Sequence, residues 1–404
     1  MAQDARTGVP DGPTTAPTAP ATPAAAPQPS TGTGRRLHYI DNLRIALTAL
    51  VVLHHTAVTY GNIPAWYYTE PAKDASGGAL DLLVMADQAF FMGFFFLIAG
   101  FFTPASYARK GPRPFVRDRL VRLGIPLLAF LLLLRPLANV TAFPAAREAA
   151  AEQGHGLSYG LFYVLSWDPG PLWFVEVLLV FILVYVLVRR RRGGAGAAAY
   201  GGPARLGALP VLAFGAGLAA VTYAWRTVCP TGTYVPVLGL PTPDFLPQYA
   251  GFFAVGVLAW RRGWAHTLSR RAGRLGFAAA AVATLAYVPL VLTVPGEELF
   301  RPGGWGSAAT ACWEAAFAIG TVCGLTVLFR ERLNRQGRLA ACLSRNAFAV
   351  YLVHAPLLVG LALALRWLQA PALAKFALVA ALALPLCWAL AGAVRRIPGV
   401  SRVL

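Results

Sequence analysis

Residues 41–56 read DNLRIALTALVVLHHT, an apolar stretch that carries four ionisable side chains. These side chains are Asp41, Arg44, His54 and His55. The stretch belongs to a predicted span over residues 43–60, close to the roughly 20 residues that a helix needs to cross a bilayer. An ionisable side chain inside hydrocarbon is costly and marks a functional site by default. The four residues are therefore candidates for function, and no other predicted span is so rich in them.

Further apolar stretches of similar length follow along the chain. The predicted spans lie near residues 43–60, 80–103, 120–140, 171–188, 206–225, 246–260, 275–294, 307–329, 346–366 and 373–394. Of 404 residues, 57% are hydrophobic and 13% are charged, and the mean hydropathy is +0.56. Soluble globular domains carry roughly 25% charged residues. We therefore expect an all-α fold, a polytopic membrane helical bundle with about ten transmembrane helices.

The net charge of +18 and the pI near 10.3 come from basic clusters in alternate loops. The loops after even-numbered spans hold these clusters: Arg109, Lys110, Arg113, Arg117, Arg119 and Arg122; Arg189 to Arg192; Arg261, Arg262, Arg270, Arg271 and Arg274; and Arg330, Arg332, Arg335 and Arg338. The other loops hold few charges of mixed sign, such as Arg226 with Asp244. This is the positive-inside pattern of a multispanning protein, so the charge indicates topology rather than nucleic-acid binding. It predicts cytoplasmic N and C termini and a multi-pass location in the inner (plasma) membrane.

Residues 1–34 differ in composition from the rest of the chain. They are rich in Ala, Pro and Thr and have almost no large apolar side chains. Such a segment cannot bury enough apolar surface to offset the entropy lost on ordering. We expect a disordered cytoplasmic tail, followed by one transmembrane domain over residues 35–404.

Five cysteines form neither a CxxC pair nor a His/Cys cluster with the spacing of metal ligands. They are Cys229, Cys312, Cys323, Cys342 and Cys387. Four fall in or beside predicted spans, where a free cysteine behaves as a small hydrophobe. We therefore expect no structural disulfide and no metal site.

The ionisable residues of the first span have a helical spacing. Eleven residues separate Arg44 from His55, which is roughly 16 Å along a helix with a net rotation of only about 20°. The two side chains thus share one face, Asp41 lies one turn before Arg44 and can pair with it, and His54 points about 100° away. Such a face fits a substrate path through the membrane. The alternative is that Arg44 reaches the lipid headgroups and the histidines bond neighbouring helices.

Arg119 and Arg122 stand three residues apart where the third span enters the membrane from the cytoplasm. Arginine side chains bind phosphates through paired hydrogen bonds, so this spacing fits a phosphate-bearing ligand. An ordinary positive-inside cluster is the alternative interpretation.

Two later spans also hold ionisable residues. The fourth span opens with Gly170, Trp173 and then Glu176, a carboxylate that needs a partner or a role. The ninth span places His354 near mid-membrane, one turn after Tyr351. Pairing of Glu176 with a basic residue and a structural hydrogen bond for His354 are the alternatives.

Taken in order, these motifs resemble the acyltransferase 3 family of membrane acyltransferases, which includes glucan succinyltransferase-like proteins and enzymes that O-acetylate bacterial glycans. The matching positions are Asp41, Arg44 and His55; the run from Phe95 to Gly100; Arg119 and Arg122; Gly170, Trp173 and Glu176; and Tyr351 and His354. One departure is Ala99, where the family pattern has Ser. The stretch from Trp173 to Glu176 and the block from Asn346 to Pro356 look closer to the glucan succinyltransferase-like branch than to the branch with a fused esterase-like domain.

The resemblance implies transfer of an acyl group, acetyl or succinyl, from cytoplasmic acyl-coenzyme A to a hydroxyl of a glycan, glycolipid or other acceptor. Acyl-coenzyme A is then a co-substrate, and no cofactor is bound. We expect its phosphates on Arg119 and Arg122, helped by Arg44. The expected catalytic residues are His55, as the general base or the acyl carrier, and Arg44. An imidazole pKa of about 6.5 suits a general base. The expected supporting residues are Asp41, Trp173, Glu176, Tyr351 and His354.

The stretch over residues 142–170 is long and aromatic, and we expect it on the outer surface as an interfacial or re-entrant segment that shapes the acceptor site. Two other functions are alternatives. One is a transporter or exporter of an anionic or acylated small molecule, which also requires intramembrane Arg and His. The other is a catalytically silent scaffold for a surface-polymer complex. Dependence on coenzyme A separates an acyltransferase from both.

Overall fold

The computed structural model describes residues 37–63, 66–192 and 205–404, and the predicted tail over residues 1–34 lies outside these ranges. The α-helices are α1 (His38–Tyr60), α2 (Gly77–Gln88), α3 (Phe91–Lys110), α4 (Pro112–Arg119), α5 (Ile125–Ala129), α6 (Arg135–Asn139), α7 (Phe143–Glu152), α8 (Tyr159–Leu165), α9 (Trp173–Arg191), α10 (Ala208–Arg226), α11 (Leu246–Arg261), α12 (Trp264–Thr267), α13 (Arg270–Thr293), α14 (Gly296–Leu299), α15 (Trp305–Arg332), α16 (Arg338–Ala364) and α17 (Ala372–Arg396). Two π-helical segments, η1 (Leu120–Gly124) and η2 (Phe130–Leu134), and four 3₁₀ segments, η3 (Val140–Ala142), η4 (Gly170–Leu172), η5 (Pro243–Phe245) and η6 (Val400–Arg402), complete the order.

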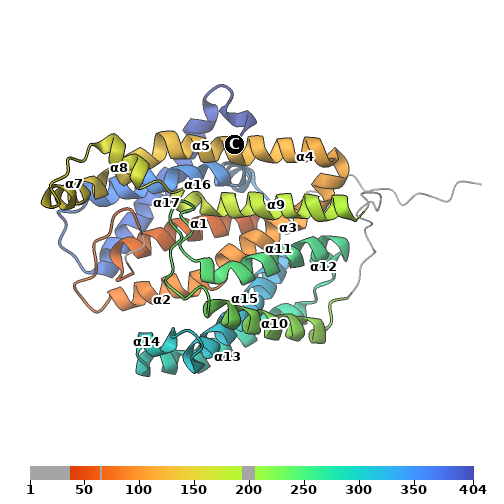
Figure 1. Cartoon of the computed structure of the whole chain (residues 1–404). Coiled ribbons are helices and arrows are strands. Elements are labelled where there is room, and N and C mark those ends of the chain that lie inside the picture. Colours follow the sequence, from red (N-terminus) through yellow and green to blue (C-terminus); the bar gives the residue numbers. More distant parts are fainter. Residues whose placement is uncertain (1–36, 64–65, 193–204) are drawn as a thin grey trace, which may run out of the picture. The chain divides into compact units, whose positions relative to one another are not determined.

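In the described ranges no strand forms, and the prediction of an all-α fold is confirmed. Nine helical segments of this part of the chain are long and apolar enough to cross a membrane, and they correspond to nine of the predicted spans. The remaining predicted span, residues 246–260, forms α11, which has 16 residues. That is shorter than the roughly 20 residues of a full crossing. The fold is a polytopic helical bundle (Figure 1).

α11 lies directly along α3. A Cβ atom at Gly100 would overlap the carbonyl oxygen of Phe253, and one at Gly256 would overlap the carbonyl oxygen of Leu97. The two helices therefore need glycine at both positions for their backbones to approach this closely, as small residues do in membrane helix pairs. Gly100 ends the Phe-rich motif of the second predicted span.

α1, which carries the ionisable residues of the first predicted span, is surrounded by other helices. It packs against α2, α3, α15, α16 and α17, and Figure 1 shows it crossing the middle of the bundle. Over half of its length is buried inside the protein. The ionisable residues of this span therefore have protein neighbours rather than lipid alone.

The third predicted span is irregular. Helical structure continues from Pro112 to Glu152, interrupted by the two π-helical segments η1 and η2. Pro126 follows η1 and Pro136 follows η2, and each lacks the N–H that an α-helix would bond to the carbonyl four residues earlier. The span continues into α7, so its helical part extends beyond the predicted end near residue 140. The stretch predicted as re-entrant holds α7 and the short helix α8.

Loops that were predicted to share one side of the membrane meet in the structure. At one end, the amide of Asn42 donates to the carbonyl of Leu333 at 2.6 Å, which ties the start of α1 to the basic loop before α16. At the other end, Lys375 forms an ion pair with Glu70, and the backbone N–H of Ala372 donates to Asp74 at 2.9 Å. At these two positions, the loops in contact are ones that the alternation of basic and mixed-charge loops assigned to the same side.

Arg226 and Asp244, which were predicted to lie in a loop on the outer side, form a buried cluster with Glu314. Nη2 of Arg226 lies 3.0 Å from Oδ2 of Asp244 and 2.9 Å from Oε2 of Glu314. All three side chains are buried, and Arg226 also lies over the ring of Phe245. The cluster joins α10, η5 and α15, and burial without this pairing would be costly for each charge.

Candidate active site

His55 of α1 contacts His354 of α16. Nδ1 of His55 lies 3.2 Å from Nε2 of His354 and 3.0 Å from the carbonyl oxygen of Val51. Nδ1 of His354 lies 2.8 Å from the carbonyl oxygen of Tyr351. Because a carbonyl only accepts, both Nδ1 atoms carry the proton in the neutral pair. The Nδ1–H of His55 is then shared between Val51 and Nε2 of His354, which leaves Nε2 of His55 unprotonated.

The aromatic rings of Trp66 and Tyr351 contact this histidine pair. The Trp66 ring stacks on His55 with a centroid separation of 4.0 Å and lies 5.9 Å from His354. Trp66 comes from the loop after α1, on the end that was predicted to face outward. Trp66 was not among the predicted site residues, although the run Trp66-Tyr67-Tyr68 directly after the first span is a visible signal.

His54 points away from the pair, as its position on the helix predicts. Its ring stacks on Phe91 at 4.9 Å and its Nδ1 lies 3.8 Å from Oδ2 of Asp87. Asp87 is buried near the end of α2 and was also missed, although it is a carboxylate inside a predicted span. The two neighbouring histidines of α1 therefore have different surroundings and different partners.

Arg44 lies at the far end of α1 from His55, about 16 Å away by helical rise. Its Nη1 lies 3.9 Å from Oδ1 of Asp41, which is the pair that the spacing predicts. Arg44 therefore shares a helix with His55 but lies too far from it to touch the same atoms of a substrate.

Arg119 and Arg122 have different surroundings at the start of the third span. Nε of Arg122 lies 3.1 Å from Oδ1 of Asp118, and Lys110 lies 2.7 Å from Oδ2 of the same carboxylate. Arg119 lies over the ring of Phe115, and its Nε is buried and has no hydrogen-bond partner in the described part of the chain. Asp118, missed in the sequence, partly neutralises Arg122.

Tyr351 connects the histidine pair to the start of α9, because its hydroxyl donates to the carbonyl of Pro171. Trp173 is buried, and the centroid of its ring lies 5.4 Å from the centroid of the Tyr249 ring. Glu176 is half-buried, and no basic residue of the described ranges pairs with it. In these ranges Glu176 is therefore not one partner of an ion pair, which was the alternative interpretation.

The backbone geometry explains why position 170 of the same motif is a glycine. Its φ of +52° lies in the left-handed region, and a Cβ atom there would overlap the hydroxyl of Tyr67. Gly170 therefore lets the aromatic loop after α1 approach the start of α9.

A fully buried arginine that the sequence analysis missed lies beside this loop. Arg135 of α6 donates to Oδ2 of Asp168 at 3.2 Å and to the carbonyl of Ser166, and its guanidinium lies 4.8 Å from the centre of the Tyr163 ring. Asp168 in turn accepts from the N–H of Gly170 at 2.7 Å. Arg135 stands directly after four leucines inside the third predicted span, which is the signal that could have revealed it. The stretch predicted to shape an acceptor site is anchored by this arginine.

Comparison with known proteins identifies relatives over most of the chain. A family model described as an acyltransferase domain, of the acyltransferase 3 type, matches residues 37–392. Proteins named glucans biosynthesis protein C, from Escherichia coli K12 and from E. coli O157:H7, are each 26% identical to this chain over 343 residues, which covers 80% of this chain and 82% of theirs. No solved structure gives a significant match.

Proposed function

Because this chain belongs to the acyltransferase 3 family, we propose that it moves an acyl group from acyl-coenzyme A to a hydroxyl group, with His55 as the reacting histidine. The family makes it a membrane acyltransferase, which argues against the transporter and scaffold alternatives. The observation that carries the role of His55 is its contact with His354, which leaves one ring nitrogen of His55 able to accept a proton.

In the proposed reaction, Nε2 of His55 removes the proton of the acceptor hydroxyl as the oxygen attacks the thioester carbonyl. The carbon–sulfur bond then breaks, and coenzyme A leaves as a thiol after taking that proton from Nε2. While His55 is charged, its Nδ1–H donates to Nε2 of His354, and the Tyr351 carbonyl holds His354 in the matching tautomer. A general base placed in this way contributes about 10²- to 10⁴-fold to the rate.

The acyl-carrier variant uses the same nitrogen. Nε2 of His55 attacks the thioester, coenzyme A leaves as the thiolate, and an acyl-imidazolium forms. The acceptor hydroxyl then attacks this acyl group, its proton passes to the coenzyme A thiolate, and the imidazole is restored. The two variants differ in whether an acylated protein accumulates when no acceptor is present.

We assign the phosphates of acyl-coenzyme A to Arg119 and Arg122, with Arg44 as a further positive charge on the same side. The buried, unpartnered Nε of Arg119 supports this assignment. The contact of Arg122 with Asp118 implies that a phosphate competes with a carboxylate there. Asp41, Trp173, Glu176 and Tyr351 are assigned supporting roles, Tyr351 because it holds both His354 and the start of α9.

For the acceptor we propose a hydroxyl of a glucan or a related glycan or glycolipid, which reaches His55 from the end where Trp66 lies. The name of the matched relatives, glucans biosynthesis protein C, supports a glucan. The bilayer is the second partner, and we place the protein in the inner (plasma) membrane. The acyl group is acetyl or succinyl.

The test is thiol release from acetyl- or succinyl-coenzyme A by purified protein in nanodiscs, with and without a glucan acceptor. His55→Ala should lower the rate by about 10²- to 10⁴-fold while still binding donor. Arg119→Ala/Arg122→Ala should weaken donor binding. The matched control is Arg271→Ala/Arg274→Ala, an exposed pair of arginines with the same spacing on α13, which should behave as wild type.

Three outcomes contradict the proposal. A folded wild-type protein that consumes no donor refutes the choice of coenzyme A thioesters. Wild-type rates in His55→Ala refute the role of the histidine. Equal donor binding by the two arginine variants refutes the phosphate site.

A further inference from the structure

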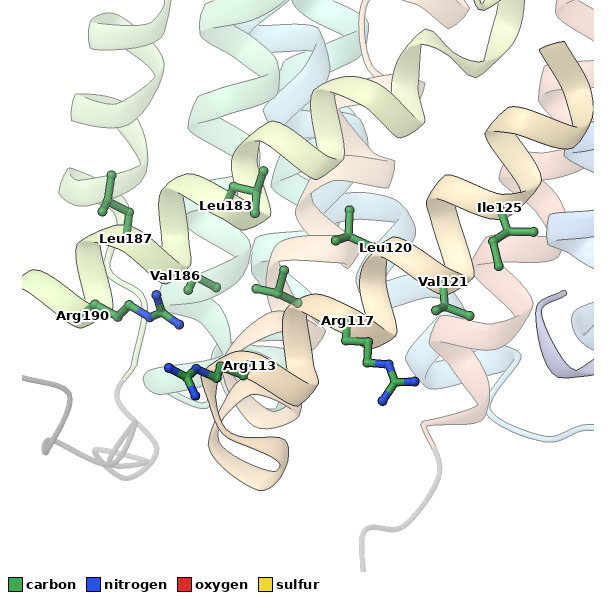
Figure 2. Close-up of a pocket in the computed structure, with 10 residues that line it drawn as sticks. Arg113, Arg117, Leu120, Val121, Ile125, Leu183, Val186, Leu187 and Arg190 are labelled. Atoms are coloured by element: carbon green, nitrogen blue, oxygen red, sulfur yellow. The ribbon is translucent and has the colours of Figure 1, made fainter. Parts of the chain in front are cut away.

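A pocket of about 570 Å³ lies between α9 and the helical run α4–η1–α5. Arg119 and Arg122 belong to this run but are not among the residues that line the pocket. Three arginines line it, Arg113 and Arg117 from α4 and Arg190 from α9. Figure 2 shows the guanidiniums of Arg113 and Arg190 pointing toward one another across the gap between the two helices, whereas Arg117 points away from them. Two basic clusters that are far apart in sequence and were both predicted to be cytoplasmic thus meet in one pocket.

No acidic side chain lines this pocket. Among the residues that the structure describes, none forms an ion pair with any of the three arginines, whereas nearby Lys110 and Arg122 both pair with Asp118. Two guanidiniums facing each other without an anion repel one another. A phosphate between Arg113 and Arg190 removes this repulsion and accepts hydrogen bonds from both.

The rest of the pocket is apolar and open to the side. Leu120 and Ile125 on one wall and Leu183 and Leu187 on the other are each close to half exposed. Both walls belong to segments long and apolar enough to cross a membrane, so these side chains lie where lipid chains are. Beyond the arginines, the lining offers no polar side chain to the two amides of a pantetheine arm.

We propose that this pocket binds an anionic glycerophospholipid of the cytoplasmic leaflet, with its phosphate between Arg113 and Arg190 and one acyl chain along Leu120 and Leu183. Basic pockets between membrane helices on the cytoplasmic side bind anionic lipid headgroups in this way. The occupant is a resident lipid and neither the acyl donor nor the acceptor, so the site is independent of the proposed reaction.

The test uses full-length protein in nanodiscs of phosphatidylcholine with a minor fraction of phosphatidylglycerol, either of which carries a photoreactive acyl chain. Phosphatidylglycerol should label the peptides that hold Leu120 to Ile125 and Leu183 to Leu187 in preference to phosphatidylcholine. Arg113→Gln/Arg190→Gln should lower this preference on the order of 30-fold, because each arginine near the headgroups contributes about fivefold. Arg117→Gln alone should have the smaller effect.

The matched control is Arg271→Gln/Arg274→Gln, which removes the same charge from exposed arginines of another basic cluster. This control should retain the labelling preference. Equal labelling by the two lipids, or equal loss in both double variants, would show only the general attraction of basic loops for anionic lipid and overturns the proposal. Displacement of the label by acyl-coenzyme A or by inorganic phosphate alone also overturns it, because the pocket would then serve a soluble ligand.

Discussion

Replacing His354 tests the histidine pair more sharply than replacing His55, because it leaves the proposed reacting nitrogen in place. His354→Ala removes the acceptor of the Nδ1–H of His55 and leaves that proton only the Val51 carbonyl. The side chain is fully buried, so the change is confined to the interior of the protein. We expect a slower chemical step with donor binding retained.

The size of the effect follows from this one hydrogen bond. Once Nε2 of His55 has taken the acceptor proton, the imidazole that donates this hydrogen bond is charged. A hydrogen bond from a charged donor contributes about 1.5–3 kcal/mol. Since about 1.4 kcal/mol corresponds to a tenfold change in rate, kcat should fall by about 10- to 150-fold. His354→Gln, whose amide oxygen can accept the same proton, should recover part of the loss.

The assay is steady-state thiol release at saturating donor, with donor binding measured separately. Thermal unfolding and elution volume establish that each variant is folded. Arg274→Ala, which removes an exposed side chain on α13, is the control and should match wild type. A folded His354→Ala protein with kcat within threefold of wild type, or one whose only defect is a higher KM, would show that His354 does not act through His55.

Three further predictions concern stability. Gly170→Ala should destabilise the protein by about 1–3 kcal/mol, because of backbone strain and overlap with the hydroxyl of Tyr67. Adding Tyr67→Phe should recover part of this loss. If the effects of the two substitutions on the free energy of unfolding simply add, the overlap is contradicted. Arg226→Met should lower the free energy of unfolding by about 3–5 kcal/mol because it leaves two buried carboxylates without their cation. Arg301→Met, which breaks an exposed ion pair, should lower it by about 1 kcal/mol or less. Equal shifts in melting temperature for the two variants contradict this prediction. The hydrogen bond from Ser76 holds the pKa of the exposed Asp74 carboxyl below its ordinary value of 3.8. Stability from Asp74 is therefore present above that value and is lost as the pH falls below it, so wild type should lose more stability on acidification than Asp74→Asn, and parallel pH profiles would contradict the assignment.

How well the sequence predicted each feature depends on how local that feature is. The Asp41–Arg44 pair and the divergent direction of His54 follow from the helical period within one span, and the structure has both. The shared face of Arg44 and His55 follows from the same period. The contact of His55 with His354 joins residues 299 positions apart, and no helical period carries that information. The family resemblance gave the two histidines in order but not their contact.

Other misses have different physical causes. Arg135 and Asp87 stand inside apolar spans, where a count of hydrophobic residues conceals one charge. Arg226 was assigned to a loop because it ends a span, yet Asp244 and Glu314 together hold it in the interior. The bounds of α11, Leu246–Arg261, match the predicted span over residues 246–260, but its 16 residues are fewer than a full crossing needs.

The π-helical segment η1 affects which residues of related proteins face the same neighbours. A π-turn closes its hydrogen bond over one more residue than an α-turn, so deleting a single residue from Leu120–Gly124 would restore α geometry. The helix on the N-terminal side of the deletion would then rotate by about 100° about its axis relative to the helix on the C-terminal side. The direction in which Arg113 and Arg119 face is thus determined by how many residues separate them from the rest of the span, as well as by their identity. In a relative without this extra residue, an arginine at an equivalent aligned position would face a different neighbour.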